Sequence, residues 1–527
     1  MRAIPRPGAT REAVLDMMME GLLIALLVFT PLAFGAVQTW ALSLMQAGLV
    51  ILFGLWVCRL IWSRSLSRSA RSLPKGGASV TFLGYRFVST GLGIPIVLFL
   101  CLILGQLLPL PPAVLRAVSP ETARTFARSL PGWDDRDAVD FAKFEGWLSP
   151  GAQEAVLPSL HAAEGQLPVS DSLSFDRTRP LSIYPYATVV RLVTFLTLLM
   201  AFLVVANCLR SRAQHERILW VVTLAGFGMS VLAVLQFLAW NGKVYWFYPV
   251  SEETSPFGPF LNHNHFAAYL EMAIPVTLGV FLLNIRRGRQ AMAPLVLGGF
   301  SAVVMLAALA LAGSRGAILS LGAATAGYGA VMIARRQAGR LEWSVAGCAI
   351  AGAILFSVWV GAGRLGEMVV RLQSIASYEQ EPSLAARLVA WTHTLNIVND
   401  YPTLGSGLGT FTEAWLFYYP PGTASVWKEA HNDYLQVAAE TGVPGLLLLA
   451  AGLWVLLRRY LFRAQRVIRG RTPADLSIHH GIGIGLLSIL FHECVDFSLQ
   501  VGAIALLFVV LSAIMIGDAV RRSEAVT

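Results

Sequence analysis

Apolar runs of about twenty residues recur along nearly the whole chain of 527 residues. A run of that length is what a helix needs to cross a bilayer. Only 13% of the residues are charged, whereas a soluble domain carries roughly 25%. The sequence therefore predicts an all-α polytopic membrane protein with about twelve transmembrane helices. The runs begin near Met17, Ala41, Gly91, Ala187, Ile218, His265, Pro294, Ala317, Trp343, Tyr434, Leu476 and Val501.

Lysine and arginine gather in every second loop between the runs, and this alternation sets the orientation. Short loops rich in these residues stay in the cytoplasm. The pattern predicts both chain ends in the cytoplasm. The net charge of +9 comes from these clusters. Their placement between apolar runs indicates a membrane protein rather than a nucleic-acid-binding one. The basic clusters lie at residues 2–11, 64–86, 210–217, 286–289, 335–340, 458–471 and 521–522.

The same alternation divides the chain into five segments. Residues 1–108 hold the amino-terminal transmembrane helices, and 109–186 form a non-cytoplasmic loop or small cap. Residues 187–362 hold transmembrane helices whose polar motifs face outward. Residues 363–431 form a large non-cytoplasmic catalytic loop, and 432–527 hold the carboxy-terminal transmembrane helices. The polar residues that could carry chemistry gather on the non-cytoplasmic side.

Two arginines stand out on that side. Arg315 lies in the sequence Gly-Ser-Arg-Gly at 313–316, where positive charge is not favoured. An arginine at a helix end can simply extend to the membrane surface, but the glycines permit close approach of a backbone or ligand, so we predict a functional role. Arg387 and Trp391 are four residues apart and share a helix face. The glycine-rich stretch 405–409 lacks a nucleotide-loop pattern, and we expect a flexible turn.

His431 and Asn432 stand where the long loop enters the tenth run. A histidine at the membrane edge is suited to accept a proton near neutral pH. An alternative is equally consistent with the sequence: a polar cluster that caps the helix, with Asn432 or Asp433 as the cap. The sequence alone leaves both interpretations open.

Two further polar groups complete the set. Asn262, His263 and His265 open the sixth run. Two histidines suggest a metal, but no third ligand with zinc-site spacing follows, so we expect hydrogen bonding to a substrate or a neighbouring loop. His492 and Asp496 are four apart, which predicts one helix face. Polar residues within a span favour function, although an interhelical hydrogen-bond pair fits equally well.

These elements, in this order, resemble the O-antigen ligase and polymerase superfamily of bacterial envelope glycosyltransferases. The resemblance runs from about Phe257 to Phe497. It does not extend to the amino-terminal third, which shares only the many spans. Its residues are Gly258-Pro259-Phe260, the stretch 262–267, Gly313-Ser314-Arg315-Gly316, Arg387 with Trp391, Tyr401-Pro402, Leu404-Gly405, Gly407-Leu408-Gly409, His431-Asn432, Glu440-Thr441-Gly442, and His492 with Asp496.

The resemblance implies a membrane-embedded, glycosyltransferase-like fold in the bacterial cytoplasmic (inner) membrane, with its active site facing the periplasm or outside. A glycan would pass from undecaprenyl diphosphate to an acceptor hydroxyl on a glycan, a lipid A core or a lipid-linked repeat. Arg315 and Arg387 would take the diphosphate role and His431 the general-base role. Substrate-binding roles would fall to Asn262, His263, His265, Trp391, Asn432, His492 and Asp496.

The chemistry of the residues fits these expectations. A lipid-linked donor already carries its leaving group, so no nucleotide is needed. Arginines fork to diphosphate oxygens and can replace a metal ion in stabilising the departing charge. We therefore expect no metal and no other cofactor; the partners are the lipid-linked donor, the acceptor and membrane lipid, with no nucleic acid.

Three alternatives remain open from the sequence. The first is a polysaccharide polymerase of the same superfamily, for O-antigen or exopolysaccharide, and the second is a protein O-oligosaccharyltransferase. The third is a non-enzymatic transporter, which the absence of a visible internal repeat disfavours.

The alternation of basic loops generates a topology prediction. A reporter fused after Arg64, Arg287 or Arg466 should report cytoplasm, and one inserted near Gly151 should report the outer side, because positive loops are retained inside. Activity of paired cytoplasmic and periplasmic reporters in whole cells measures this. A cytoplasmic signal near Gly151 would remove the outward placement of the whole motif set.

Overall fold

The computed structural model describes residues 7–67, 79–82, 85–130, 178–209, 211–251, 254–287, 292–334, 382–418, 426–458 and 473–526, with a few isolated residues besides. The chain is mostly helical, which confirms the predicted all-α polytopic membrane fold. Eight helices of the described part are long and apolar enough to cross a membrane. They lie within α1 (Pro7–Leu32), α2 (Thr39–Ser67), α8 (Pro185–Cys208), α9 (Arg212–Leu238), α10 (His263–Arg286), α11 (Met292–Ala312), α12 (Arg315–Ala334) and α17 (Asp433–Arg458).

Three more of the expected spans coincide with shorter apolar helices. These are α3 (Gly93–Gln106) and the apolar parts of α19 (Pro473–His492) and α20 (Gly502–Val526). The span expected near Trp343 lies outside the described residues. Short 3-10 turns, η1 (Phe34–Ala36) and η4 (Ser498–Gln500), lead from α1 into α2 and from α19 into α20.

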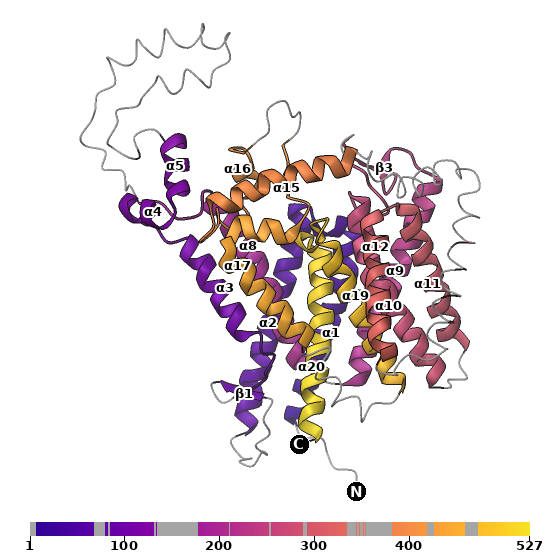
Figure 1. The fold of residues 1–527 in the computed structure, drawn as a ribbon. Coiled ribbons are helices and arrows are strands. Elements are labelled where there is room, and N and C mark those ends of the chain that lie inside the picture. Colours follow the sequence, from indigo (N-terminus) through magenta and orange to yellow (C-terminus); the bar gives the residue numbers. More distant parts are fainter. Residues whose placement is uncertain are drawn as a thin grey trace, which may run out of the picture.

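Small elements gather at the two ends of the helical bundle (Figure 1). At one end lie α4 (Pro112–Val118), α5 (Pro120–Ser129), α16 (Phe411–Trp415) and the antiparallel pair β3 (Lys243–Val244) and β4 (Tyr248–Pro249), and α15 (Pro382–Asp400) runs across the top of the spans. At the other end lies the antiparallel hairpin of β1 (Ser79–Phe82) and β2 (Tyr85–Val88), in which Ser79 pairs with Val88. Parts of both predicted non-cytoplasmic loops, 109–186 and 363–431, therefore share one end with the β3–β4 pair.

The described ends of the 109–186 segment pack on the helices that follow residue 382. The hydroxyl groups of Thr125 in α5 and Tyr401 after α15 are 2.8 Å apart. The Gln106 side chain at the end of α3 is fully buried and donates to the carbonyl oxygens of Leu404 and Glu440, at 2.6 and 2.8 Å. Thr125 in the 109–186 segment and Gln106 just before it thus contact the second long loop, at Tyr401 and Leu404.

Ion pairs close the opposite end of the bundle. Arg59 in α2 pairs with Asp16 in α1, Arg217 in α9 with Glu20 in α1, and Arg287 at the end of α10 with Glu216 in α9. These pairs join α1 to α2, α1 to α9, and α9 to α10 at the end that carries the basic loops. Some of the arginines that set the predicted orientation therefore also hold neighbouring helix ends together.

The helix α10 forms the centre of the bundle, and 89% of its apolar stretch is buried. It packs against α19 through glycines, which let two helix backbones approach closely in a membrane. A Cβ atom at Gly481 would lie 2.3 Å from the Pro275 carbonyl oxygen, and one at Gly485 would lie 2.9 Å from that of Met272. Because no side chain fits at these distances, the α10–α19 contact requires glycine at both positions.

We expect Gly481→Ala to lower the stability of the purified protein by about 1–3 kcal/mol, because an added methyl group overpacks the helix contact. Gly452→Ala in α17 is the matched control, since no atom lies within 4 Å of its added Cβ and alanine favours a helix. Thermal unfolding in detergent compares them. Equal melting temperatures for the two variants would contradict the role of the glycine contact.

Candidate functional site

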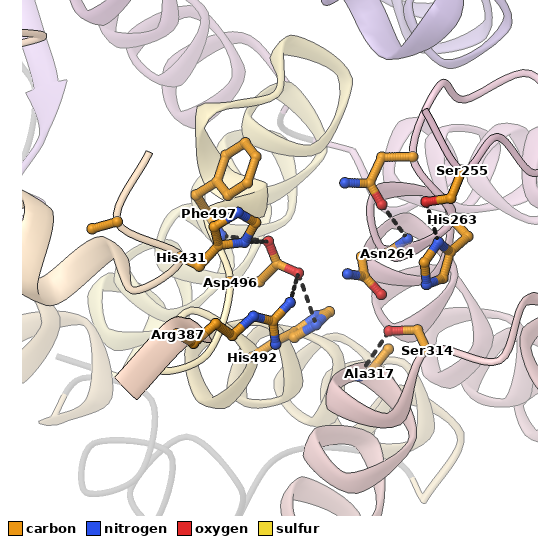
Figure 2. A network of polar contacts seen from close by, with 12 residues as sticks. Ser255, His263, Asn264, Ser314, Ala317, Arg387, His431, His492, Asp496 and Phe497 are labelled. Atoms are coloured by element: carbon orange, nitrogen blue, oxygen red, sulfur yellow. Dashed lines mark hydrogen bonds and ion pairs between the residues drawn. The ribbon is translucent and has the colours of Figure 1, made fainter. Parts of the chain in front are cut away.

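Three cationic or titratable side chains converge on the carboxylate of Asp496 (Figure 2). His431 Nδ1 lies 3.6 Å from Oδ1, while Arg387 Nη2 and His492 Nε2 lie 3.8 and 4.0 Å from Oδ2. The Asp496 side chain is only 1% exposed. Three residues that the sequence singled out, on three separate stretches, thus meet around a fourth, the buried acid Asp496.

Electrostatics keep this acid ionised. Burial by itself raises the pKa of Asp496. The nearby His431 and the charges of His492 and His265 outweigh burial and hold the pKa of Asp496 well below its usual range. The backbone N–H of Phe497 also donates to Oδ1 at 2.9 Å. At neutral pH the cluster therefore contains a buried carboxylate that attracts positive charge.

The local path of the chain differs from the helix expected for residues 492–496. The helix α19 ends at His492, and the Val495 N–H donates to the His492 carbonyl oxygen at 2.9 Å in a tight turn. His492 and Asp496 therefore do not share a helix face, and that prediction was wrong. They still come together because the turn folds the carboxylate back over the helix end.

His431 is held in place by its neighbours along the chain. The Trp391 indole N–H donates to the Ala430 carbonyl oxygen at 3.0 Å, and the Asn432 side chain accepts from the Leu435 N–H at the start of α17. His431 itself has a φ of +50°, a left-handed conformation that costs a non-glycine residue roughly 1–2 kcal/mol. Strain of this kind marks residues whose position is imposed by the surrounding structure.

Trp391 and Asn432 therefore act through the backbone around His431. The helix cap expected of the His431–Asn432 pair is present, because Asn432 accepts from the first turn of α17. The His431 ring points to Asp496 (Figure 2), and its role as a proton acceptor stays a prediction. The His431 ring lies edge-on to Phe497, with centroids 4.8 Å apart, and to Trp427, at 5.1 Å. These aromatic rings fix the plane of the imidazole.

The Gly-Ser-Arg-Gly sequence is explained by its place before α12. Gly313 has a φ of +71°, which favours glycine, and the Ser314 hydroxyl lies 3.4 Å from the Ala317 N–H of the first turn. A Cβ atom at Gly316 would lie 2.7 Å from His492 Nε2, so the absent side chain makes room for that ring. Arg315, half-buried, begins the helix beside this contact.

The sixth-run residues divide into two groups. Asn262 caps α10 by accepting from the Asn264 N–H at 2.8 Å, and His263 Nδ1 lies 2.9 Å from the Ser255 hydroxyl. These two hydrogen bonds are to the residues' own loop and helix start. His265 is buried and packs edge-on against Phe497, with centroids 4.9 Å apart. It therefore belongs to the cluster around Asp496.

The glycine-rich stretch 405–409 is closely packed rather than a flexible turn. A Cβ atom at Gly405 would lie 2.1 Å from the Glu440 carbonyl carbon. The Gly409 N–H donates to the Glu440 carboxylate at 2.7 Å. Gly405, Gly407 and Gly409 all have positive φ values. The expectation was wrong because the glycines serve close approach to α17, which periodicity does not reveal.

Several polar residues of the site escaped the sequence reasoning. Arg191 in α8 pairs with Glu429 at 3.2 Å, and the Gln436 side chain donates to Glu429 at 2.5 Å and to Glu440 at 3.0 Å. Glu271 in α10 is fully buried and lies 3.0 Å from His492 Nδ1. An acid in the middle of an apolar run was the available signal.

Comparison with known families agrees with the motif set. Residues 300–450 match the family model described as O-Antigen ligase. The match includes Arg315, Arg387, His431 and the 405–409 stretch, and it confirms the resemblance to the O-antigen ligase superfamily. Such a family implies glycosyltransferase-like activity on a lipid-linked glycan and an acceptor. No curated protein matches the chain.

Metal independence remains a prediction. Among the residues that the structure describes, no three His, Cys, Asp or Glu side chains form a group that could hold a metal ion. We expect the purified protein to keep its transfer activity in excess chelator, because the arginines can supply the positive charge. Turnover with and without chelator measures this. Activity that is lost and then restored by a divalent ion would instead assign His263 and His265 as ligands.

Proposed function

We propose that this protein, whose residues 300–450 match the O-antigen ligase family, moves a glycan from undecaprenyl diphosphate to an acceptor hydroxyl on the outer side of the cytoplasmic membrane. The observation that carries the proposal is an accessible histidine and an accessible arginine on one buried carboxylate. The side chains of His431 and Arg387 are 24% and 23% exposed, whereas those of Asp496 and His492 are 1% exposed. The first two can touch substrates, and the other two position them.

His431 is the general base. Asp496 Oδ1 faces Nδ1, so the carboxylate favours the tautomer that carries its proton on Nδ1 and leaves a lone pair on Nε2. The distance of 3.6 Å is long for a hydrogen bond, and such contacts commonly tighten when substrate binds. As the acceptor oxygen attacks the anomeric carbon, its proton passes to Nε2. Asp496 then stabilises the imidazolium that forms.

Arg387 and Arg315 bind the leaving group. When the bond from the anomeric carbon to the diphosphate breaks, the electron pair stays on the diphosphate oxygen, and planar guanidinium groups stabilise this charge. The Arg387–Asp496 distance of 3.8 Å exceeds a hydrogen bond, so the carboxylate orients the guanidinium without forming a bidentate pair with it. Arg315 begins α12 at the Gly316–His492 contact, which brings its backbone to the same end of the bundle.

The test measures donor binding and turnover in the same purified variants. His431→Ala should cut turnover by about a hundred- to ten-thousand-fold, the usual range for a general base, with donor binding largely retained. Arg315→Ala and Arg387→Ala should weaken donor binding and abolish transfer, and Arg387→Lys should rescue poorly because lysine lacks the planar fork. Arg124→Ala in α5, which removes a 67% exposed arginine, is the control and should transfer normally.

Two results would overturn these assignments. Near-normal product with alanine at both Arg315 and Arg387 would remove the diphosphate site. Equal losses of donor binding and turnover in His431→Ala would make that histidine a binding or structural residue.

In a strain that lacks the protein, full-length lipid-linked chains should accumulate. A loss of chain length with single repeats retained would instead assign a polymerase.

A further inference from the structure

The polar cluster continues from Asp496 into the apolar part of the bundle. Glu271 in α10 is fully buried, and both of its carboxylate oxygens are bound by α19. Oε1 lies 3.0 Å from His492 Nδ1, and Oε2 accepts from the Ser488 hydroxyl at 2.9 Å. His492 therefore lies between two buried carboxylates, with Glu271 on Nδ1 and Asp496 on Nε2 at 4.0 Å.

This arrangement constrains the protons on the imidazole. A neutral ring that donates Nδ1–H to Glu271 would turn the lone pair of Nε2 toward the Asp496 carboxylate, which is repulsive. A ring with protons on both nitrogens interacts favourably with both acids. The buried charges then balance, because Glu271 and Asp496 contribute two negative charges while His492 and Arg387 contribute two positive ones. An unbalanced buried charge would be far more costly.

Other charged and titratable groups surround this pair. Arg387 reaches the same Asp496 oxygen from α15, His431 faces the other oxygen, and His265 lies across Phe497 on α10. Glu493 follows His492 in the chain, and burial together with Asp433 and Asp496 raises the pKa of Glu493, which favours its neutral form. Arg315 begins α12 beside the ring. Even with these groups included, a charged His492 leaves no excess negative charge next to His431.

We propose that Glu271 holds His492 as a buried imidazolium. This pair positions Asp496 behind His431 and partly compensates the negative charge of Asp496. The inference rests on the proposed function, in which His431 is the base. His492 is then not a second base, because its Nε2 lies where a Cβ of Gly316 would be 2.7 Å away and its side chain is 1% exposed. No acceptor hydroxyl can reach it.

A charged His492 influences the pH dependence of turnover in a defined direction. When Glu271 becomes glutamine, His492 loses the acid that keeps it charged and becomes neutral. Asp496 then lacks one of its two compensating cations, so it stabilises protonated His431 more strongly. When His431 holds its proton more tightly, its neutral form, which is the base, is present only at higher pH. The acid limb of the turnover profile must therefore move to higher pH, while activity recovers on the alkaline side.

The experiment records turnover against pH for purified parental protein, Glu271→Gln and His492→Gln. Both variants should move the acid limb upward by on the order of one pH unit, the scale of a charge effect at this range. Their KM for the lipid-linked donor should stay unchanged, because neither residue touches it. Tyr328→Phe is the matched control: it removes a buried 2.8 Å hydrogen bond between α12 and His480 of α19 without touching the cluster.

The control separates a charge effect from a packing effect. Tyr328→Phe should lower thermal stability and leave the acid limb in place. If Glu271→Gln lowers only the plateau of turnover, or moves the acid limb to lower pH, the proposal that His492 is charged is overturned. If the parental profile has no acid limb, or His431→Ala keeps its turnover, it is the proposed general base that fails instead.

A second measurement does not depend on catalysis. In protein labelled with ¹⁵N at histidine, His492 should give the signal of a doubly protonated ring that persists at pH 8. This signal should be absent from His492→Gln and lost at pH 8 in Glu271→Gln, while Tyr328→Phe keeps it. A spectrum in which every histidine is neutral at pH 8 in the parental protein would overturn the proposal, whatever the protein transfers.

Discussion

A carboxylate buried as completely as that of Asp496 persists only when positive charge is brought to it, and the arrangement of the motifs follows from this requirement. His431 comes from the start of α17, Arg387 from α15, and His492 from the end of α19. Each of these side chains comes from a different helix or helix end. One acid thus gathers two histidines and an arginine, for which we propose the roles of base, positioning residue and anion-binding group, into a single site at one end of the bundle.

The site depends on how closely two helices approach in the middle of the bundle. Gly481 and Gly485 bring α19 against the backbone of α10, and this contact places His492 within 3.0 Å of Glu271. Gly316 gives the same histidine its room at the start of α12. Small residues are a common means of helix association in lipid, where apolar burial supplies little driving force. Here they also set the distances within a polar network.

The position of the glycine-rich stretch 405–409 also depends on hydrogen bonds from a distant segment. Gln106, in the amino-terminal third, donates to the carbonyl oxygens of Leu404 and Glu440 and accepts from the Leu408 N–H. Glu440 in turn accepts from the Gly409 N–H. The amino-terminal helices, which carry none of the family motifs, therefore hold the glycine-rich stretch on α17. This explains why a site assembled from the later part of the chain needs the earlier helices.

The sequence by itself determined the class of fold and the end of the bundle where the polar residues gather. Apolar runs of span length must leave water, and basic loops report orientation through charge alone, so both follow from local composition. The sequence pattern alone singles out Arg387, His431, His492 and Asp496. The cap formed by Asn432 was also among the sequence alternatives, because helix caps are local.

Only the tertiary structure decided which of these residues meet. The turn after His492, rather than a helix face, brings Asp496 over the end of α19. The glycines at 405–409 serve close packing, and Glu271 proves to be the partner of His492. Each of these depends on contacts between segments far apart in the chain. A carboxylate selects its partners by charge and burial in space, and neither quantity is a property of local sequence.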